Sequence, residues 1–298
     1  MKRVLTAVVL IPVVLAIVFW APLWLFALVV AAIIILALHE YLAIVEAAGI
    51  KPFRWLVYVV SVFPIFLLLL SIVMAHLPPH SRYYWAVSVY RTWWQIALLS
   101  PAIFGIPLIF RNDMGRGLGS VAASILGIVY IGVSLSLLIP LRADDTRSVL
   151  VIFILFSVWA GDIAAYYVGR SLGRHKLAPV VSPNKSWEGA IASVLASVGI
   201  AVLVLHFRHV LDEWFSYPGM FREDTFPPVW PLSLAHALVL GVLTNVAAQF
   251  GDLFESALKR GANVKDSGTL LPGHGGMLDR IDALLFAIPI VAVYTSLV

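Results

Sequence analysis

The sequence predicts an all-α, polytopic integral membrane protein with about nine transmembrane helices and a cytoplasmic N-terminus. Three observations predict this fold class: 61% of the 298 residues are apolar, only 12% are charged, and the mean hydropathy is +0.98. Soluble domains carry about 45–50% apolar and about 25% charged residues. The apolar runs are continuous rather than alternating, which excludes an outer-membrane barrel. The chain has no cysteine, which excludes a disulfide scaffold.

The charge of the chain excludes a nucleic-acid-binding protein. The formal net charge is only +4, and the 20 lysine and arginine residues are dispersed along the sequence. Nucleic-acid-binding domains instead concentrate basic residues in a patch or stripe. The informative charges are the few within or beside apolar segments, because a charge next to hydrocarbon is costly.

Nine apolar segments predict the membrane-spanning helices, since a span needs about 20 mostly apolar residues. They are 5–20, 23–38, 55–75, 95–110, 118–141, 149–168, 187–207, 232–250 and 281–298. Lys2 and Arg3 precede the first segment, as in a signal peptide. However, Pro12 interrupts it, no cleavage site of small residues follows, and apolar sequence resumes at once. We therefore expect the first span to be retained.

The basic residues between these segments predict the orientation. With the N-terminus inside, 14 of the 20 lysine and arginine residues fall in inner segments and 6 in outer ones. Inner loops of membrane proteins carry the excess of positive charge. The segments 169–186 and 251–280 therefore face the cytoplasm. We divide the chain into an N-terminal membrane region of about five spans, 1–140, and a C-terminal region, 141–298, which contains both loops and the expected functional site.

The densest charged stretch of the chain is 251–282, between the last two apolar segments. The eighth segment runs directly into it, which predicts that its helix continues out of the membrane. Residues three or four apart share a helix face, so Asp252, Ser256 and Lys259 would line one side. The helix should end near Gly261, because glycine suits the C-terminal cap.

A glycine-rich turn and two carboxylates follow that helix. In the turn, residues 271–276, proline and glycine surround His274, and such turns can bring backbone N–H groups together around an anion. Asp279 and Asp282 lie three residues apart and would share a face of the last helix. Mg²⁺ prefers one or two carboxylates plus substrate phosphates, and lysine or arginine neutralises charge on a transferring group. The stretch therefore has the residue types that phosphoryl chemistry needs.

Single residues of this stretch also have simpler interpretations. Lys259, Arg260 and Lys265 satisfy the positive-inside rule. His274 is compatible with an ordinary loop, and Asp266 with a turn cap. The carboxylates next to apolar sequence have no comparable explanation, because charge beside hydrocarbon is costly.

A second polar segment, 182–189, reads SPNKSWEG on the same predicted side of the membrane. It predicts a proline turn followed by a helix start, with Ser186 as the N-cap. A helix N-terminus next to Lys185 favours anions, although an ordinary capped span has the same pattern. Asp162, near the inner end of the sixth segment, either joins this polar region or pairs with Arg170. We favour the first, because an unpaired carboxylate in the membrane is expensive.

Residues 256–282, SALKRGANVKDSGTLLPGHGGMLDRID, resemble the signature of phosphatidate cytidylyltransferases, also called CDP-diacylglycerol synthases. The segment 182–189 resembles the S-P-x-K-[ST]-x-E-G element of the same family, and the predicted spans resemble those of bacterial members. The resemblance implies transfer of a cytidylyl group from CTP to phosphatidate, with CDP-diacylglycerol and pyrophosphate as products. It also implies Mg²⁺ with K⁺ as a second cation, and a homodimer in the cell (inner) membrane with a cytoplasmic site.

The resemblance assigns roles to individual residues. It implies two metal ligands, Asp252 and Asp279, and Asp162 is a third candidate from its place in an apolar segment. Catalytic groups around the substrate phosphates would be Lys259, Arg260, Lys265, Asp266, His274 and Asp282. Substrate-binding groups would be Ser182, Asn184, Lys185, Ser186, Glu188, Ser256, Gly273, Gly275, Gly276 and Arg280. A phosphate oxygen of phosphatidate would attack the α-phosphorus of CTP, so the protein mainly positions substrates and neutralises their charge.

Other functions remain open at this point. CTP-dependent polyprenol or phytol kinases and CDP-archaeol synthase would differ in the lipid acceptor. A cation-coupled transporter would spread polar residues along several spans, whereas here they concentrate at one surface. CDP-alcohol phosphotransferases carry a D-G-x2-A-R-x8-G-x3-D-x3-D pattern, which does not occur in this sequence.

Overall fold

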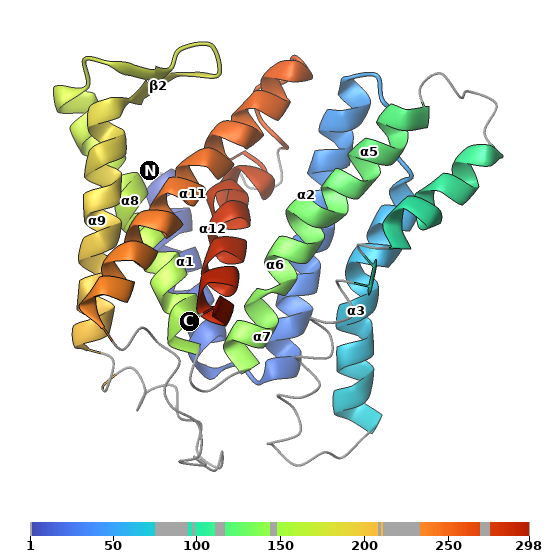
Figure 1. The fold of residues 1–298 in the computed structure, drawn as a ribbon, viewed down its shortest axis with the longest axis horizontal. Helices are drawn as coiled ribbons and strands as arrows, with labels where there is room; N and C mark the ends of the chain where they lie inside the picture. Colours follow the sequence, from blue (N-terminus) through green and yellow to red (C-terminus); the bar gives the residue numbers. More distant parts are fainter. Residues whose placement is uncertain are drawn as a thin grey trace. The chain divides into compact units, whose positions relative to one another are not determined.

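The structure is a computed structural model that describes residues 2–74, 95–96, 99–110, 117–143, 148–207, 210, 233–268 and 275–297. Its labelled helices are α1 (Lys2–Trp20), α2 (Leu23–Ala47), α3 (Arg54–Met74), α5 (Gly117–Gly127), the π-helix η2 (Ile128–Val133), α6 (Ser134–Ser136), α7 (Leu138–Ala143), α8 (Ser148–Leu172), α9 (Trp187–His206), α11 (Leu234–Gly261) and α12 (Leu278–Leu297) (Figure 1). One small hairpin is formed by β1 (Lys176–Ala178) and β2 (Ser182–Ser186). The described chain is therefore all-α apart from this hairpin.

The contacts within the chain define two compact units. The first comprises residues 1–140 and 258–280, and the second comprises 141–257 and 281–298. Helices α11 and α12 each contribute to both units. Residues 258–280 of the predicted C-terminal region thus group with the first unit.

Six helical segments are long and apolar enough to cross a membrane, counted over the described part of the chain. They are α2, α8, α9, α11, α12 and the segment Gly117–Ala143, which joins α5 to α7. Three shorter apolar helices, Ile11–Trp20, Arg54–Leu70 and Leu99–Ile109, fall in the other three predicted segments. The chain is a multi-pass membrane protein, whereas nine crossings and a cytoplasmic N-terminus stay predictions.

Helix α2 is longer than its apolar run predicts. It continues past residue 38 and ends in a Schellman motif, in which Gly49 N–H donates to Glu46 O at 2.9 Å and Ile50 N–H donates to Val45 O at 3.2 Å. Gly49 has φ of 80°, which suits a residue without a Cβ. Because the helix extends this far, Glu40 is part of it and is buried.

The end of α11 confirms one prediction and corrects another. The helix ends at Gly261, as predicted. However, the left-handed residue is Asn263, with φ of 56°, and not the glycine. Asn263 N–H donates to Arg260 O at 3.1 Å and Val264 N–H donates to Lys259 O at 2.9 Å. Asparagine takes this position because its short polar side chain tolerates the left-handed region.

In the first unit, a buried tyrosine joins α2 to the α5–η2 segment. Tyr41 OH donates to Ala123 O at 2.8 Å, and its ring meets that of Tyr130 edge-on. A Cβ at Gly127 would lie 2.7 Å from the Tyr41 ring, so the glycine permits this close approach. The contact fixes α2 at the residue that follows Glu40.

In the second unit, helix α8 packs along α9, and buried polar side chains join both to α11. Asn245 Nδ2 donates to Ser193 Oγ at 2.9 Å and to Ser197 Oγ at 2.7 Å. Ser197 Oγ donates in turn to Ser157 O at 2.7 Å, and Gln249 Nε2 donates to Asn245 Oδ1 at 2.6 Å. Interhelical hydrogen bonds of this kind help to hold helices together in membranes, where lipid weakens the hydrophobic driving force.

Asn245→Ala should lower the stability of the purified protein, because it removes three side-chain hydrogen bonds at once. Such bonds contribute about 0.6 kcal/mol on average in membrane proteins, so we expect a loss of about 1–2 kcal/mol in the free energy of unfolding. Denaturant unfolding in mixed micelles measures this. In the control Ser296→Ala, the lost hydroxyl is exposed and bonds to Val293 O of its own helix. Equal losses in the two variants would contradict the prediction.

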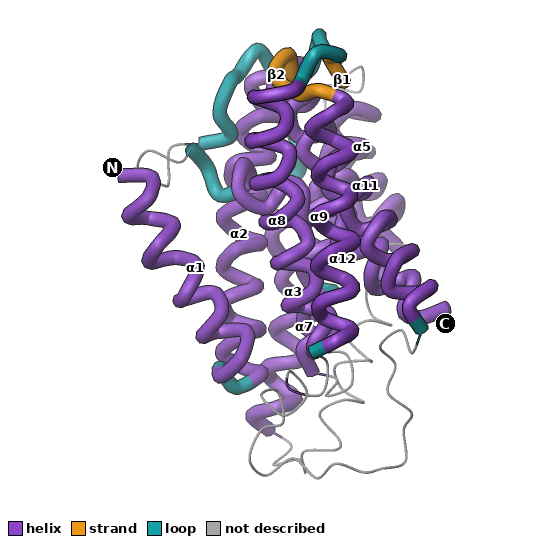
Figure 2. The backbone as a smooth tube through the Cα atoms, turned by 90° about the vertical axis from the view of Figure 1, so that its left-hand side faces the viewer, coloured by secondary structure: helices purple, strands orange, loops and turns teal. Residues whose placement is uncertain are grey.

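The segment 182–189 differs from its predicted form. Instead of a proline turn, its first five residues form strand β2, which runs antiparallel to β1 and pairs Ser186 with Lys176. Figures 1 and 2 show this hairpin at one end of α8 and α9. A two-stranded hairpin is marginal alone and needs packing against other elements, which explains why the sequence pattern does not reveal it. Pro183 is tolerated because a two-stranded ribbon has only edge strands.

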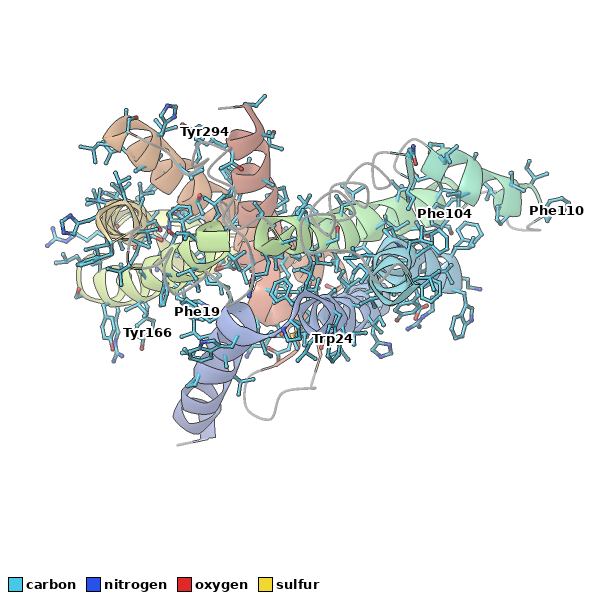
Figure 3. All side chains as sticks on the ribbon, turned by 90° about the horizontal axis from the view of Figure 1, so that it is seen from below. Phe19, Trp24, Phe104, Phe110, Tyr166 and Tyr294 are labelled. Carbon is cyan, nitrogen blue, oxygen red and sulfur yellow. The ribbon has the colours of Figure 1, made fainter. Side chains whose placement is uncertain are left out.

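Large apolar side chains are exposed along the described helices. Trp24, Phe110 and Tyr166 are among those that project outward, whereas Phe104 is fully buried (Figure 3). Helices that present apolar residues both to the interior and to the outside are typical of membrane proteins. The outer faces therefore support the membrane class that the composition predicts.

Candidate active site

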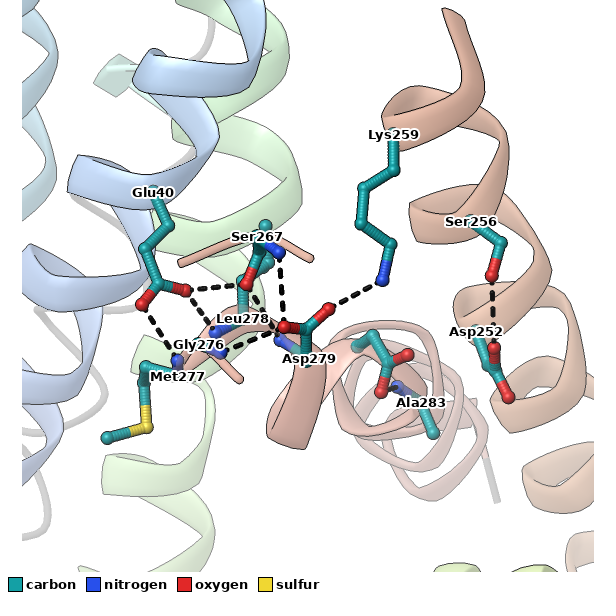
Figure 4. A network of polar contacts seen from close by, with 11 residues as sticks. Glu40, Asp252, Ser256, Lys259, Ser267, Gly276, Met277, Leu278, Asp279 and Ala283 are labelled. Atoms are coloured by element: carbon teal, nitrogen blue, oxygen red, sulfur yellow. Dashed lines mark hydrogen bonds and ion pairs between the residues drawn. The ribbon is translucent and has the colours of Figure 1, made fainter. Parts of the chain in front are cut away.

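Asp279 is the centre of a polar cluster in the first unit. Its Oδ1 forms an ion pair with Lys259 Nζ at 2.5 Å, and its Oδ2 accepts hydrogen bonds from the N–H groups of Gly276 at 2.8 Å and Ser267 at 3.1 Å (Figure 4). The lysine and aspartate side chains are only 13% and 12% exposed. Charge-assisted hydrogen bonds are short and strong. The Asp279 carboxylate is thus held in one orientation by contacts from α11 and from the signature segment, residues 256–282.

The glycines that precede α12 make room for this cluster. Gly275 has φ of 76°, a left-handed conformation that glycine adopts without strain. A Cβ at Gly276 would collide with Ser267 Oγ and with the Glu40 carboxylate. The N–H of Gly276 donates to Asp279, so this turn binds a carboxylate of the chain itself. Its predicted role in binding substrate stays a prediction.

Glu40 belongs to the same cluster, although the sequence patterns do not point to it. Its carboxylate accepts hydrogen bonds from Ser267 Oγ at 2.8 Å, Met277 N–H at 2.9 Å and Leu278 N–H at 2.8 Å. A signal was present, because Glu40 is the one acidic residue in the apolar run 23–45. A carboxylate in an apolar run is a candidate for function, but the predicted end of the span at residue 38 left it outside the membrane.

In the second unit, an ion pair joins the two polar segments of the sequence. Lys185 Nζ on β2 lies 2.6 Å from Asp252 Oδ2 on α11, and both side chains are partly exposed. Ser256 Oγ donates to Asp252 Oδ1 at 3.5 Å, so these two residues share a helix face as predicted. The structure therefore brings a basic residue of 182–189 to a carboxylate of 251–282.

Asp162 lies in the electrostatic field of the same ion pair. It interacts with Asp252 and with Lys185 from its position on α8. Arg170, the alternative partner in the sequence, donates instead to Tyr166 OH at 3.0 Å. The structure thus places Asp162 with the second unit's polar cluster.

Asp282 on α12 lies near two carboxyl groups of α11. Asp282 interacts electrostatically with Asp252 and with Glu255, which is fully buried and which the sequence patterns also miss. The close approach depends on Gly251, where a Cβ would lie 2.5 Å from Asp282 O. Carboxyl groups are therefore concentrated where α11 and α12 meet in the second unit.

The start of α9 confirms the predicted N-cap. Ser186 Oγ accepts the N–H of Gly189 at 3.2 Å. Glu188, in the first turn, pairs with His175 Nδ1 at 2.7 Å and accepts the His175 N–H at 3.2 Å. These contacts tie the chain that enters β1 to the helix that follows β2, and they hold Lys185 next to the cap.

The remaining predicted residues lie at the surface or outside the described residues. Those that are exposed are Asn184, Arg260, Lys265, Asp266 and Arg280, and Ser182 is half-buried. Gly273 and His274 fall outside the described residues. The roles predicted for these residues therefore stay predictions.

The two clusters have the donor type for Mg²⁺ but do not form a metal site by themselves. Carboxylate oxygens suit Mg²⁺, which usually takes one or two of them and completes its shell with water and substrate phosphates. Over the described part of the chain, no three acidic or histidine side chains come together as a metal-binding group. Asp252 and Asp279 instead each pair with a lysine. Each cluster, taken by itself, therefore offers carboxylate oxygens of the type that suits a cation arriving with phosphates.

Comparison with known proteins decides the family. The profile of the Cytidylyltransferase family matches residues 1–298, the whole chain. This chain belongs to the cytidylyltransferase family. The signature segment and the ion pairs around Asp252 and Asp279 are thus features of a cytidylyltransferase-family protein.

Curated relatives of this family member are named phosphatidate cytidylyltransferase. The Staphylococcus haemolyticus protein is 35% identical over 169 residues, which are 57% of this chain and 56% of that protein. The Brucella suis protein is 39% identical over 186 residues, 62% of this chain and 60% of that protein. The Thermotoga maritima protein is 37% identical over 183 residues, 61% of this chain and 62% of that protein. The match thus covers less than two thirds of each relative.

Gly276→Ala should destabilise the cytidylyltransferase fold around Asp279. The new Cβ would collide with Ser267 Oγ and the Glu40 carboxylate, and overpacking of this kind costs about 1–3 kcal/mol. We expect a lower midpoint of thermal unfolding in detergent. Gly261→Ala is the matched control, because a Cβ there meets no atom within 4 Å. If the two alanine variants unfold at the same temperature, the inference that Gly276 has no room for a Cβ is wrong.

Proposed function

We propose that the protein transfers a cytidylyl group from CTP to phosphatidate, giving CDP-diacylglycerol and pyrophosphate in phospholipid biosynthesis. The observation that carries the proposal is the alignment with relatives named phosphatidate cytidylyltransferase. The polar clusters support it chemically. They combine lysines with carboxylates on helices α11 and α12, the residue types needed to handle phosphates beside a membrane.

In the proposed reaction, a phosphate oxygen of phosphatidate attacks the α-phosphorus of CTP. A new oxygen–phosphorus bond forms, and the bond between the α-phosphorus and the bridging oxygen of pyrophosphate breaks. The phosphate monoester is largely dianionic at neutral pH, so the attack requires no strong general base. Catalysis then rests on positioning and on neutralisation of charge.

The lysines of the two clusters supply positive charge in this proposal. Lys185 and Lys259 are each held at a carboxylate, at 2.6 Å and 2.5 Å. A lysine fixed by an ion pair loses less conformational entropy when it binds a phosphate than a free surface lysine does. Each ammonium has three N–H donors, so it can bind a phosphate oxygen while it still contacts its aspartate.

Mg²⁺, with K⁺ as a second cation, remains part of the proposal. Asp252, Asp279 and Asp162 are the proposed metal ligands, and their carboxylate oxygens are of the appropriate type. When bound, Mg²⁺ would offset the negative charge of the phosphates. We also propose that the protein is a homodimer in the inner membrane and that its site faces the cytoplasm, where CTP is found.

The test uses the purified full-length protein in detergent with phosphatidate, Mg²⁺ and CTP labelled at either the α- or the γ-phosphate. Cytidylyl transfer should carry the α-label, and not the γ-label, into a chloroform-soluble product that requires phosphatidate. Label from the γ-position in a polyprenol or phytol acceptor would instead indicate a kinase. Transfer of the α-label only to an archaeol-type lipid would indicate CDP-archaeol synthesis.

A further inference from the structure

Glu40 in helix α2 is a buried carboxylate that is bound by the signature segment. Its side chain is 5% exposed. Oε1 accepts the Met277 N–H at 2.9 Å, and Oε2 accepts both the Leu278 N–H at 2.8 Å and the Ser267 hydroxyl at 2.8 Å (Figure 4). Burial of a charge is costly unless hydrogen bonds compensate it. Three converging donors provide that compensation.

These hydrogen bonds cap the N-terminus of α12. The first N–H groups of a helix have no partner within the helix. Here the N–H groups of Met277 and Leu278 donate to Glu40, and that of Asp279 donates to Ser267 Oγ at 3.3 Å. A carboxylate is also favoured there by the partial positive charge of the helix end. Glu40 thus acts as the N-terminal cap of α12 although it lies far away in the sequence, whereas a cap is usually the residue just before the helix.

Ser267 connects Glu40 to Asp279. A serine hydroxyl has a single donor, and that of Ser267 points to Glu40. The orientation leaves the hydroxyl oxygen free to accept the Asp279 N–H, while the Ser267 backbone N–H donates to Asp279 Oδ2 at 3.1 Å. The carboxylate that pairs with Lys259 is therefore held by groups that Glu40 orients.

Two glycines enclose the Glu40 carboxylate. A Cβ on Gly268 would lie 2.6 Å from its Oε1, and a Cβ on Gly276 would collide with its Oε2. Tyr41, the next residue of α2, is anchored by its hydrogen bond to Ala123 O. The carboxylate is thus confined by the signature segment and by the helix that carries it.

We propose that Glu40 is a positioning residue for cytidylyl transfer. It caps α12 and orients Ser267, and so it holds Asp279 and its partner Lys259 in the geometry of the chemical step. This inference rests on the proposed function. It gives helix α2 of the N-terminal region a part in the reaction. Because Glu40 contacts the protein and not the substrates in this proposal, its loss should lower kcat and leave KM for CTP nearly unchanged.

The test compares Glu40→Gln with Glu46→Gln in the full-length protein. Glutamine keeps the shape of Glu40, but one terminal atom becomes an NH₂ group that faces a donor. Glu46 lies on the same helix and pairs with Arg54 at 2.8 Å at the surface, so its neutralisation is the matched control. Three quantities are measured on the monodisperse fraction: kcat, KM for CTP, and the amide hydrogen exchange of peptides that contain Met277 and Leu278.

We expect Glu40→Gln to lower kcat per folded protein about 10- to 100-fold, the range typical of residues that orient a functional carboxylate. KM for CTP should stay within about threefold. Exchange at Met277 and Leu278 should become faster, and Glu46→Gln should match the wild type in all three measurements. A wild-type kcat in folded Glu40→Gln, or a change in KM alone, would overturn the proposal.

A second variant keeps the test decisive if Glu40→Gln does not fold. Ser267→Ala removes only the hydroxyl that links Glu40 to Asp279, and it should lower kcat in the same direction. Wild-type kcat in folded Ser267→Ala would overturn the positioning role. Failure of the proposed function can be told apart from failure of the positioning role, because in the first case the wild type itself would make no labelled lipid. Even if the wild type is inactive, the capping of α12 by Glu40 can be tested separately. Amide hydrogen exchange at Met277 that is the same in Glu40→Gln as in the wild type would show that Glu40 does not cap α12.

Discussion

Asp279→Asn should reduce the transfer of label from α-labelled CTP to lipid by about 10²- to 10³-fold, the effect typical of one preorganised electrostatic contact. The change removes the negative charge that pairs with Lys259 at 2.5 Å. It also places an NH₂ group near the N–H donors of Gly276 and Ser267, or near the lysine. In either orientation the carboxylate geometry is lost. The measurement is kcat at saturating CTP and phosphatidate.

A double variant separates the chemical effect of Asp279→Asn from its effect on stability. Lys259 would be left with a largely buried charge, and removal of one partner from a buried pair costs about 3–5 kcal/mol. Lys259→Met with Asp279→Asn removes both charges, so the unfolding temperature should recover while activity does not. Recovery of activity in the double variant would show that Asp279 serves only to neutralise Lys259.

Asp252→Asn should also reduce turnover by about 10²- to 10³-fold, but with little change in stability. Its ion pair with Lys185 is partly exposed, with 25% and 37% of the two side chains accessible, and exposed pairs contribute only about 0–1 kcal/mol. We therefore expect Asp279→Asn and Asp252→Asn to lose similar amounts of activity, but only Asp279→Asn to lose much stability. Thermal unfolding and label transfer, measured on the same preparation, test both parts.

Lys185→Met, Asp252→Asn and the variant that carries both changes form a double-mutant cycle. If the two residues act as one unit on the phosphates, the double variant should be hardly less active than either single variant, because effects within a unit are not additive. Glu46→Gln serves as the control for loss of a surface carboxylate. Full additivity of the two losses would contradict a shared role for the ion pair.

Local and compositional features were predictable from the sequence. The membrane class follows from composition, because continuous apolar runs with few charges can be satisfied only in lipid. The N-cap at Ser186 and the end of α11 at Gly261 follow from short-range hydrogen bonding, which neighbouring residues determine. The family follows from the signature segment, because its residues are contiguous.

The tertiary structure alone decides which distant groups meet. Glu40 reaches the N–H of Leu278, 238 residues later, and no local pattern records that contact. The pairing of Lys185 with Asp252 likewise joins residues far apart in the chain. The β1–β2 hairpin is local, but it depends on packing against α8 and α9. The sequence by itself therefore determines the membrane class, the family and the residue types of the site. Packing decides the partners, because a buried charge is stable only where the fold brings donors or an opposite charge to it.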